Sequence, residues 1–115
     1  MKRTISSVSV VVTLATLFAL PMSATAKDMS GKEIAFDRKL GNCLGCHNIS
    51  GGSQPGNVGP PLIAMKARFP NKADLRAQIW DATTKNPNSL MPPFGRHQAL
   101  SESQIDKVTN FIHSL

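Results

Sequence analysis

Two cysteines and a histidine stand close together in the chain, in the pattern Cys-x-x-Cys-His over residues 43–47. Two thiols three residues apart on one irregular helical turn can reach the two vinyl groups of a porphyrin, and the adjacent imidazole can meet the iron from one face. This spacing is the signature of covalent haem attachment. It predicts one haem c, bound covalently through Cys43 and Cys46, with His47 as an axial ligand of the iron.

Three other chemistries use cysteines at this spacing: a thioredoxin-like redox pair, a structural disulfide and half of a zinc site. A zinc ribbon needs a second cysteine pair, and the sequence contains only two cysteines. A thioredoxin motif follows a strand in a βαβ unit, and the sequence has no strand-like alternation around the motif. Haem attachment is therefore the favoured interpretation.

The sixth coordination position of the iron decides what such a haem does, and the candidates for it are Met29, Met65, Met91, His97 and His113. Met91 is preferred because the two prolines after it fix a stiff, non-helical backbone that can present a thioether to the far haem face. His97 is the second choice. Met65 is expected to be an ordinary helix methionine, and His113 to be a structural cation in the last turn of a helix.

Histidine and methionine together would saturate the iron, raise its potential and leave no position for oxygen or substrate. The expected chemistry is then one-electron transfer. A backbone carbonyl should orient His47 through its other ring nitrogen, and the carbonyl of Pro60 is the expected acceptor. A five-coordinate haem that binds gas or peroxide is a further hypothesis, and carbon monoxide binding would distinguish it.

The elements that position these groups are predicted to be helices and loops. A capping box at Ser30 begins a helix over residues 31–41, and a second capping box at Ser101 begins the last helix. The last helix carries one apolar side, formed by Ile105, Val108, Ile112 and Leu115.

Between these two helices the sequence predicts a short helix over residues 62–68 and a helix capped by Asn71 that ends at residues 86–88. Residues 50–61 and 90–95 are rich in glycine or proline and predict ordered loops. The predicted fold class is all-α, with small helices and long loops wrapped around one covalent haem.

The first 26 residues have a positive start, an apolar stretch and a small-residue cleavage site, which together predict a secretory signal peptide. The remaining residues, 27–115, are enough for one domain, whose thin core would be completed by the porphyrin. Removing Lys2 and Arg3 from the 13 basic residues leaves 11 against seven acidic residues, a net charge of +4. The basic residues are scattered, so nucleic acid is not an expected partner, and no membrane span is expected after processing.

Over nearly all of residues 27–115 the chain resembles the class I cytochromes c. An N-terminal helix precedes the attachment motif, a Gly-Pro-x-Leu segment at residues 59–62 follows it, and a methionine loop and a C-terminal helix complete the pattern. In that family the proline carbonyl accepts from the ligand histidine. The resemblance thus implies the same roles for Pro60 and Met91 as the residues themselves suggest.

Three stretches are similar to the SoxX family, the mono-haem subunits of SoxAX cytochromes of bacterial sulfur oxidation. They are residues 31–47 (GKEIAFDRKLGNCLGCH), 68–83 (RFPNKADLRAQIWDAT) and 88–97 (NSLMPPFGRH). The resemblance implies a periplasmic heterodimer with a SoxA-type cytochrome, which acts as an L-cysteine S-thiosulfotransferase by joining thiosulfate to a cysteine of a SoxYZ-type carrier.

Both cysteines of this chain are expected to be consumed as thioethers, so the chain would not be catalytic alone. Its expected part is to take electrons from the partner's haem and pass them to a small soluble acceptor, such as another cytochrome. The alternative is a free-standing soluble periplasmic electron carrier. Size-exclusion chromatography of the native protein would separate the two hypotheses.

Overall fold

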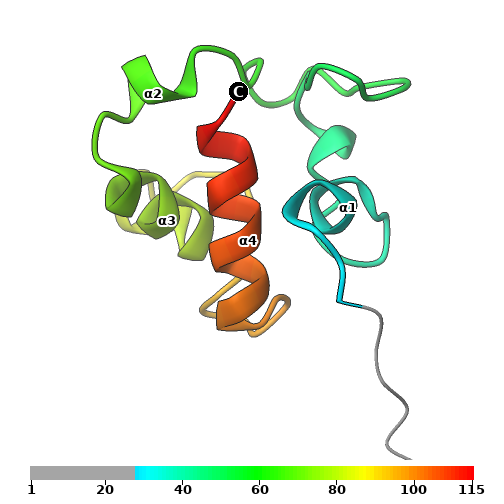
Figure 1. The fold of residues 1–115 in the computed structure, drawn as a ribbon. Coiled ribbons are helices and arrows are strands. Elements are labelled where there is room, and N and C mark those ends of the chain that lie inside the picture. Colours follow the sequence, from blue (N-terminus) through cyan, green and yellow to red (C-terminus); the bar gives the residue numbers. More distant parts are fainter. Residues whose placement is uncertain (1–27) are drawn as a thin grey trace, which may run out of the picture.

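The computed structural model describes residues 28–115, which form helices and loops and contain no strand. The predicted all-α fold class is confirmed. In chain order the elements are α1 (Gly31–Phe36), η1 (Cys43–Gly45), α2 (Met65–Arg68), α3 (Lys72–Trp80), η2 (Ala82–Thr84) and α4 (Glu102–His113), where η marks a 3₁₀ turn. Helix α4 lies between α1 and α3 and packs against both (Figure 1). The signal peptide predicted over residues 1–26 lies outside the described residues.

Both predicted capping boxes are present. The hydroxyl of Ser30 accepts from the Glu33 backbone N–H at 3.2 Å, and the Glu33 carboxylate accepts from the Ser30 N–H at 2.8 Å. At α4, Ser101 and Gln104 repeat the arrangement at 3.2 and 2.9 Å. Each box satisfies two backbone donors that a helix start otherwise leaves without partners, so the sequence locates these two helix starts correctly.

Helix α1 ends at Phe36, five residues before the predicted end. Asp37 has extended backbone angles, and its carboxylate accepts from the Lys39 N–H at 2.7 Å. Its carbonyl also accepts from the N–H groups of Leu40 and Asn42. An aspartate that bonds its own neighbouring backbone offers the chain an alternative to the helix, which explains the early end.

Helix α3 also ends earlier than predicted, at Trp80. The predicted cap is correct, since the Asn71 side chain accepts from the Ala73 N–H at 3.0 Å. The end lies at Asp81, whose carboxylate accepts from both the N–H and the hydroxyl of Thr83 and so begins the separate turn η2. As at Asp37, a short acidic side chain competes with the helix for backbone donors.

The predicted helix over residues 62–68 is reduced to the single turn of α2, Met65–Arg68. Ala64 stands before it in the left-handed region, at φ 51° and ψ 40°, which breaks any helical continuation from Leu62. Leu62 is instead tied to the backbone directly after the Cys-x-x-Cys-His pattern, because its N–H donates to the Asn48 carbonyl at 2.9 Å.

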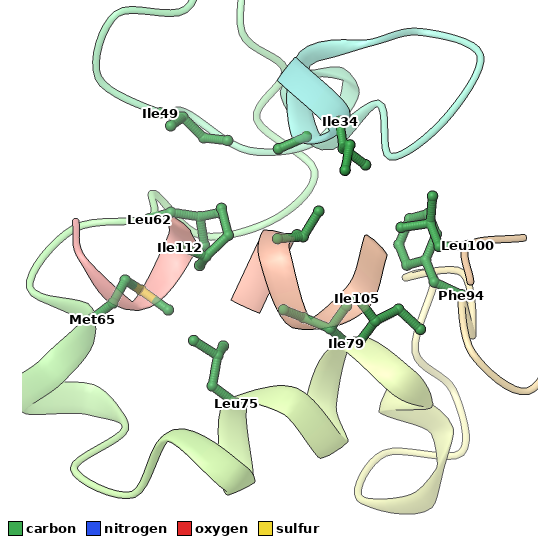
Figure 2. Packing of buried hydrophobic residues seen from close by; sticks show 12 residues of the cluster. Ile34, Ile49, Leu62, Met65, Leu75, Ile79, Phe94, Leu100, Ile105 and Ile112 are labelled. Atoms are coloured by element: carbon green, nitrogen blue, oxygen red, sulfur yellow. The ribbon is translucent and has the colours of Figure 1, made fainter. Parts of the chain in front are cut away.

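Buried side chains from α1, α3 and α4 form the core together with residues from the loops (Figure 2). Helix α4 contributes Ile105, Val108 and Ile112, the apolar side predicted from its sequence. Polar side chains also join α3 to α4 at the surface: Arg76 pairs with Asp106 and with Glu102. Among residues 28–115, no helix is long and apolar enough to cross a membrane.

Candidate functional site

The turn that carries the two cysteines is closed by its own backbone. The Cys43 carbonyl accepts from the N–H of Cys46 at 3.2 Å and from the N–H of His47 at 2.9 Å. Asn42 starts the turn in the left-handed conformation, at φ 46° and ψ 36°. The result is one tight turn whose two thiols and imidazole all line the same cavity.

The loop that follows is bound to this turn at two places. The Gly56 N–H donates to the Leu44 carbonyl, and the Gly59 N–H donates to the Cys46 carbonyl, each at 2.8 Å. A Cβ atom on Gly56 would lie 2.1 Å from the Gly45 carbonyl oxygen, so this approach requires a residue without a side chain. The glycines of the predicted loop thus let it lie directly against the attachment turn.

His47 is oriented by the predicted carbonyl. Its Nδ1 donates to the Pro60 carbonyl at 2.7 Å. The ring also lies against the backbone of Gly59, where a Cβ atom would be 2.4 Å from the ring carbon Cε1. Nε2 has no hydrogen-bond partner among the described residues, so the nitrogen that an iron would use remains available.

The cavity behind this turn has a volume of about 620 Å³, within the roughly 300–1,000 Å³ of small-molecule and cofactor sites. Much of the buried core forms its wall: Leu62, Met65, Leu75, Ile79, Phe94, Leu100, Val108 and Ile112. Other parts of the wall are polar, with Asn42, Arg68, Gln78, Asn86, Asn88 and Ser89. An apolar interior with a polar part of the wall fits a haem, whose macrocycle is apolar and whose propionates are charged.

The chemistry of the cysteines fits the same cofactor. Neither is in a disulfide, and burial raises the pKa of the Cys43 thiol to about 11. A buried thiol with a raised pKa lacks the thiolate character of a reactive redox cysteine. Within residues 28–115, no group of three or more His, Cys, Asp or Glu side chains is placed to bind a metal ion.

Met91 lies on the same cavity as His47 and both cysteines, although it is 44 residues further along the chain. It is half-buried, and its N–H donates to the Ser89 hydroxyl at 3.2 Å. The structure thus brings together all five residues singled out from the sequence, Cys43, Cys46, His47, Pro60 and Met91, around one cavity.

The other candidate ligands are placed differently. His97, the second choice, is exposed and is not part of the cavity wall. Nε2 of His113 donates to the Phe69 carbonyl at 2.9 Å, in agreement with its structural interpretation. Met65 does line the cavity, and its sulfur accepts from the Arg68 guanidinium at 3.4 Å. Met29 lies apart from this cavity, near Lys107 of α4.

Sequence reasoning missed several residues that support the site. Gly59 gives the imidazole its room, and Arg68 donates to the Pro61 carbonyl, next to the acceptor of His47. Asp81 and Arg96 form an ion pair beside the methionine loop. The Gly-Pro pair at residues 59–60 could have indicated the role of Gly59. Nothing in the spacing of Asp81 and Arg96 indicates that their side chains meet.

Small helices surround the cavity, and the Cys-x-x-Cys-His turn forms part of its wall. This combination defines the class of protein. The sequence profile of the cytochrome c family matches residues 29–115, and the chain belongs to this family. It is an electron-transfer cytochrome with the class I fold and one covalently bound haem c.

A comparison with solved structures gives a more specific similarity than the family. The chain is similar to the crystal structure of SoxXA from P. pantotrophus, with a TM-score of 0.66 and 26% sequence identity. The match covers 73% of this chain and 77% of that chain. The resemblance to SoxX stated from the sequence motifs is thereby confirmed. A comparison with curated protein sequences gave no match.

Proposed function

We propose that the protein is the electron-transfer subunit of a SoxAX-type complex that joins thiosulfate to a carrier-protein cysteine in the periplasm. The observation that carries the proposal is the meeting of Cys43, Cys46, His47 and Met91 on one apolar cavity. The likeness to SoxXA supports the choice of complex. Residues 1–26 would direct export and be removed, because they have the pattern of a signal peptide.

Each side chain of the site has a separate part in this proposal. Cys43 and Cys46 would hold the haem through thioethers, and Nε2 of His47 and the sulfur of Met91 would bind its iron. The haem supplies a one-electron couple. The Pro60 carbonyl fixes the ring orientation and the tautomer of His47 through Nδ1, which also increases the basicity of Nε2.

With His47 and Met91 as its two ligands, the iron would exchange electrons and would offer no coordination position to thiosulfate or oxygen. Sulfur transfer also needs a reactive thiolate or ligand sulfur, and both cysteines of the sequence are engaged by the haem. The bond between sulfur atoms would therefore form on a SoxA-type partner, with a SoxYZ-type carrier as acceptor. This chain would pass the released electrons to a small soluble acceptor, such as another cytochrome.

Two exposed apolar residues at the cavity support contact with a protein partner. Val58 is 64% exposed and Leu90 is 82% exposed, and both belong to the cavity wall. Exposed apolar side chains beside a redox site favour close approach of another protein, which short electron-transfer distances require. We assign this surface to the SoxA-type subunit because the similar structure is a SoxXA complex.

Co-purification tests the assignment. The native protein, isolated with its haem, should elute in size-exclusion chromatography together with a second c-type cytochrome. Leu90→Glu should weaken that association, whereas Ile63→Glu is the matched control, because Ile63 is 62% exposed but is not part of the cavity wall. Elution as a lone mono-haem species would overturn the complex and favour the free-standing carrier.

A functional assay completes the test. Thiosulfate should reduce the haem of this chain only when the partner cytochrome and the carrier protein are both present. Reduction by thiosulfate without the partner would mean that substrate reaches this iron directly, and the proposed division of labour would be wrong.

A further inference from the structure

The backbone that presents Met91 to the cavity contains no helix and no strand. Residues 85–101 connect η2 to α4, and turns with local hydrogen bonds take the place of regular structure. A ligand on such a segment keeps its position only if the segment is tied to the rest of the fold. The attachments of this segment therefore bear on how well Met91 holds the iron, if Met91 is the ligand as proposed above.

The first attachment joins Gly95 to the end of α3. The N–H groups of Gly95 and Arg96 both donate to the Trp80 carbonyl, at 3.1 and 3.4 Å. Gly95 also lies directly against the Trp80 indole, since a Cβ atom on Gly95 would be 2.1 Å from the ring carbons Cδ2 and Cε3. Only glycine allows the two to approach so closely.

The second attachment is the side chain of Asp81, which is buried with 5% of its surface exposed. One carboxylate oxygen accepts from the N–H and hydroxyl of Thr83, at 3.0 and 2.5 Å. The other oxygen pairs with Nε of Arg96 at 3.0 Å. A single carboxylate thus ends α3, begins η2 and binds the methionine segment.

We propose that Asp81 and Arg96 are positioning residues for the axial methionine. Together with Trp80 and Gly95 they form a clamp, here called the Asp81 clamp, on the backbone four to five residues after Met91. Pro92 and Pro93 lie between Met91 and the clamp, and their fixed φ angles make that connection stiff. Loosening the clamp therefore lets the sulfur move away from its place in the cavity.

The clamp acts through the backbone, because neither Asp81 nor Arg96 is part of the cavity wall. Phe94 adds to the connection: it is buried in the core, lines the cavity and stands between the stiff prolines and Gly95. The Asp81 carboxylate accepts one ion pair and two hydrogen bonds from uncharged donors, and all three are charge-assisted. Such bonds are stronger than neutral ones, so this carboxylate is well suited to hold one loop geometry.

Ligand exchange on the oxidised holoprotein tests the clamp. Imidazole competes with a methionine sulfur for ferric iron, and loss of the methionine-to-iron charge-transfer band reports its binding. Arg96→Gln and Asp81→Asn should each lower the imidazole concentration at half-exchange by about tenfold, the effect of losing one charge-assisted hydrogen bond. Arg96→Lys keeps the charge and should restore part of the difference.

Asp28→Asn is the matched control. It makes the same change from carboxylate to amide in another ion pair, with Lys107 of α4, and neither residue belongs to the clamp or to the cavity wall. Its half-exchange concentration should equal that of the unchanged protein. Because Arg96 is 54% exposed, Arg96→Gln should fold, and it decides the question if Asp81→Asn does not accumulate.

The results separate the clamp from the function on which it rests. If the unchanged protein shows the charge-transfer band while Arg96→Gln exchanges ligand at the unchanged concentration, the clamp is wrong and Met91 remains the ligand. If the unchanged protein lacks the band, or Met91→Ala keeps it, the ligand assignment is wrong and the clamp with it.

Discussion

The two sides of the cavity are built in different ways. On the histidine side, the cysteines, His47 and Pro60 lie within 18 residues of sequence, and the turn and the following loop bond mainly to each other. On the methionine side, Met91 depends on Trp80 and Asp81, which belong to a different element of the fold. One side is fixed by local sequence and covalent chemistry, and the other by tertiary contacts. We therefore expect substitutions on the first side to prevent haem incorporation and those on the second side to tune an assembled site.

The largest expected effect is that of His47→Ala. The imidazole is the proposed first axial ligand, and the haem is expected to fill the cavity in the core. Loss of the imidazole should therefore impair folding as well as haem attachment. We expect the yield of haem-containing protein to fall by more than about 100-fold, beyond the effect typical of losing an outer-shell partner. Haem staining and the visible spectrum measure it, with the exposed neighbour Asn48→Ala as control. Normal haem content in His47→Ala would contradict the local construction of this side.

Met91→Ala should leave the haem attached while changing its properties. Losing a thioether ligand opens the sixth position and lowers the reduction potential, by on the order of 0.1 V within the roughly 0.8 V that axial ligands span. Potentiometry and carbon monoxide binding check both expectations. His97→Ala is the control, since His97 is exposed and lies outside the cavity wall. An unchanged potential in Met91→Ala, or a lowered one in His97→Ala, would mean that the ligand was misassigned.

The same substitution can be made on both sides. A methyl group at Gly59 would collide with the His47 ring, and one at Gly95 would collide with the Trp80 indole. Each should cost about 1–3 kcal/mol of folding free energy, as overpacking usually does. Gly59→Ala should reduce haem incorporation, whereas Gly95→Ala should weaken the methionine-to-iron band in a fully loaded protein. Identical behaviour of the two variants would remove the distinction between the sides.

Acid should affect the methionine side through Asp81. Hydrogen bonds from Thr83, chiefly from its hydroxyl, and the charge of Arg96 hold the pKa of this carboxyl below its ordinary value of 3.8. A carboxylate with a lowered pKa in the folded state stabilises the fold above the unfolded pKa, and this contribution is lost as the pH falls through the folded pKa. Stability measured from about pH 5 to pH 2 should therefore fall less steeply for Asp81→Asn than for the unchanged protein. Parallel curves would show that Asp81 contributes nothing through its charge.

The smallest expected effect lies at the surface, in the ion pair of Arg76 with Glu102. The Glu102 side chain is 76% exposed, so water and salt screen its interaction. Glu102→Gln should change the free energy of unfolding by no more than about 0.5 kcal/mol, measured by denaturant titration. A loss as large as that of Gly95→Ala would indicate that this contact between α3 and α4 stabilises the fold far more than an exposed ion pair usually does.

The contrast between the two sides also explains what could be predicted from the sequence. The attachment motif, the Pro60 carbonyl and the two capping boxes depend on residues a few positions apart, whose chemistry is readable from spacing. Met91 could be singled out because the prolines after it restrict its own backbone. All of these features are present in the structure at the expected positions.

Two of the three errors in helix length, at α1 and α3, have a common cause in acidic residues that end helices. Asp37 and Asp81 each bond to backbone two residues ahead, and the helical pattern of the sequence continues past both. The pairing of Asp81 with Arg96 is a tertiary contact across 15 positions, and no periodicity indicates it. Gly95 could be seen as a loop glycine, but its contact with Trp80 depends on where α3 ends.

The left-handed backbone at Asn42 restricts which residues the protein can accept there. Asparagine, aspartate and glycine adopt this conformation readily, whereas a β-branched residue does so only at considerable cost. The amide of Asn42 also fills the space beside Gly45, within 2.9 Å of where a Cβ atom would stand. In natural variants that keep this backbone, the position before the first cysteine should therefore tolerate few substitutions. The Cys-x-x-Cys-His pattern does not include this position and so does not express the constraint.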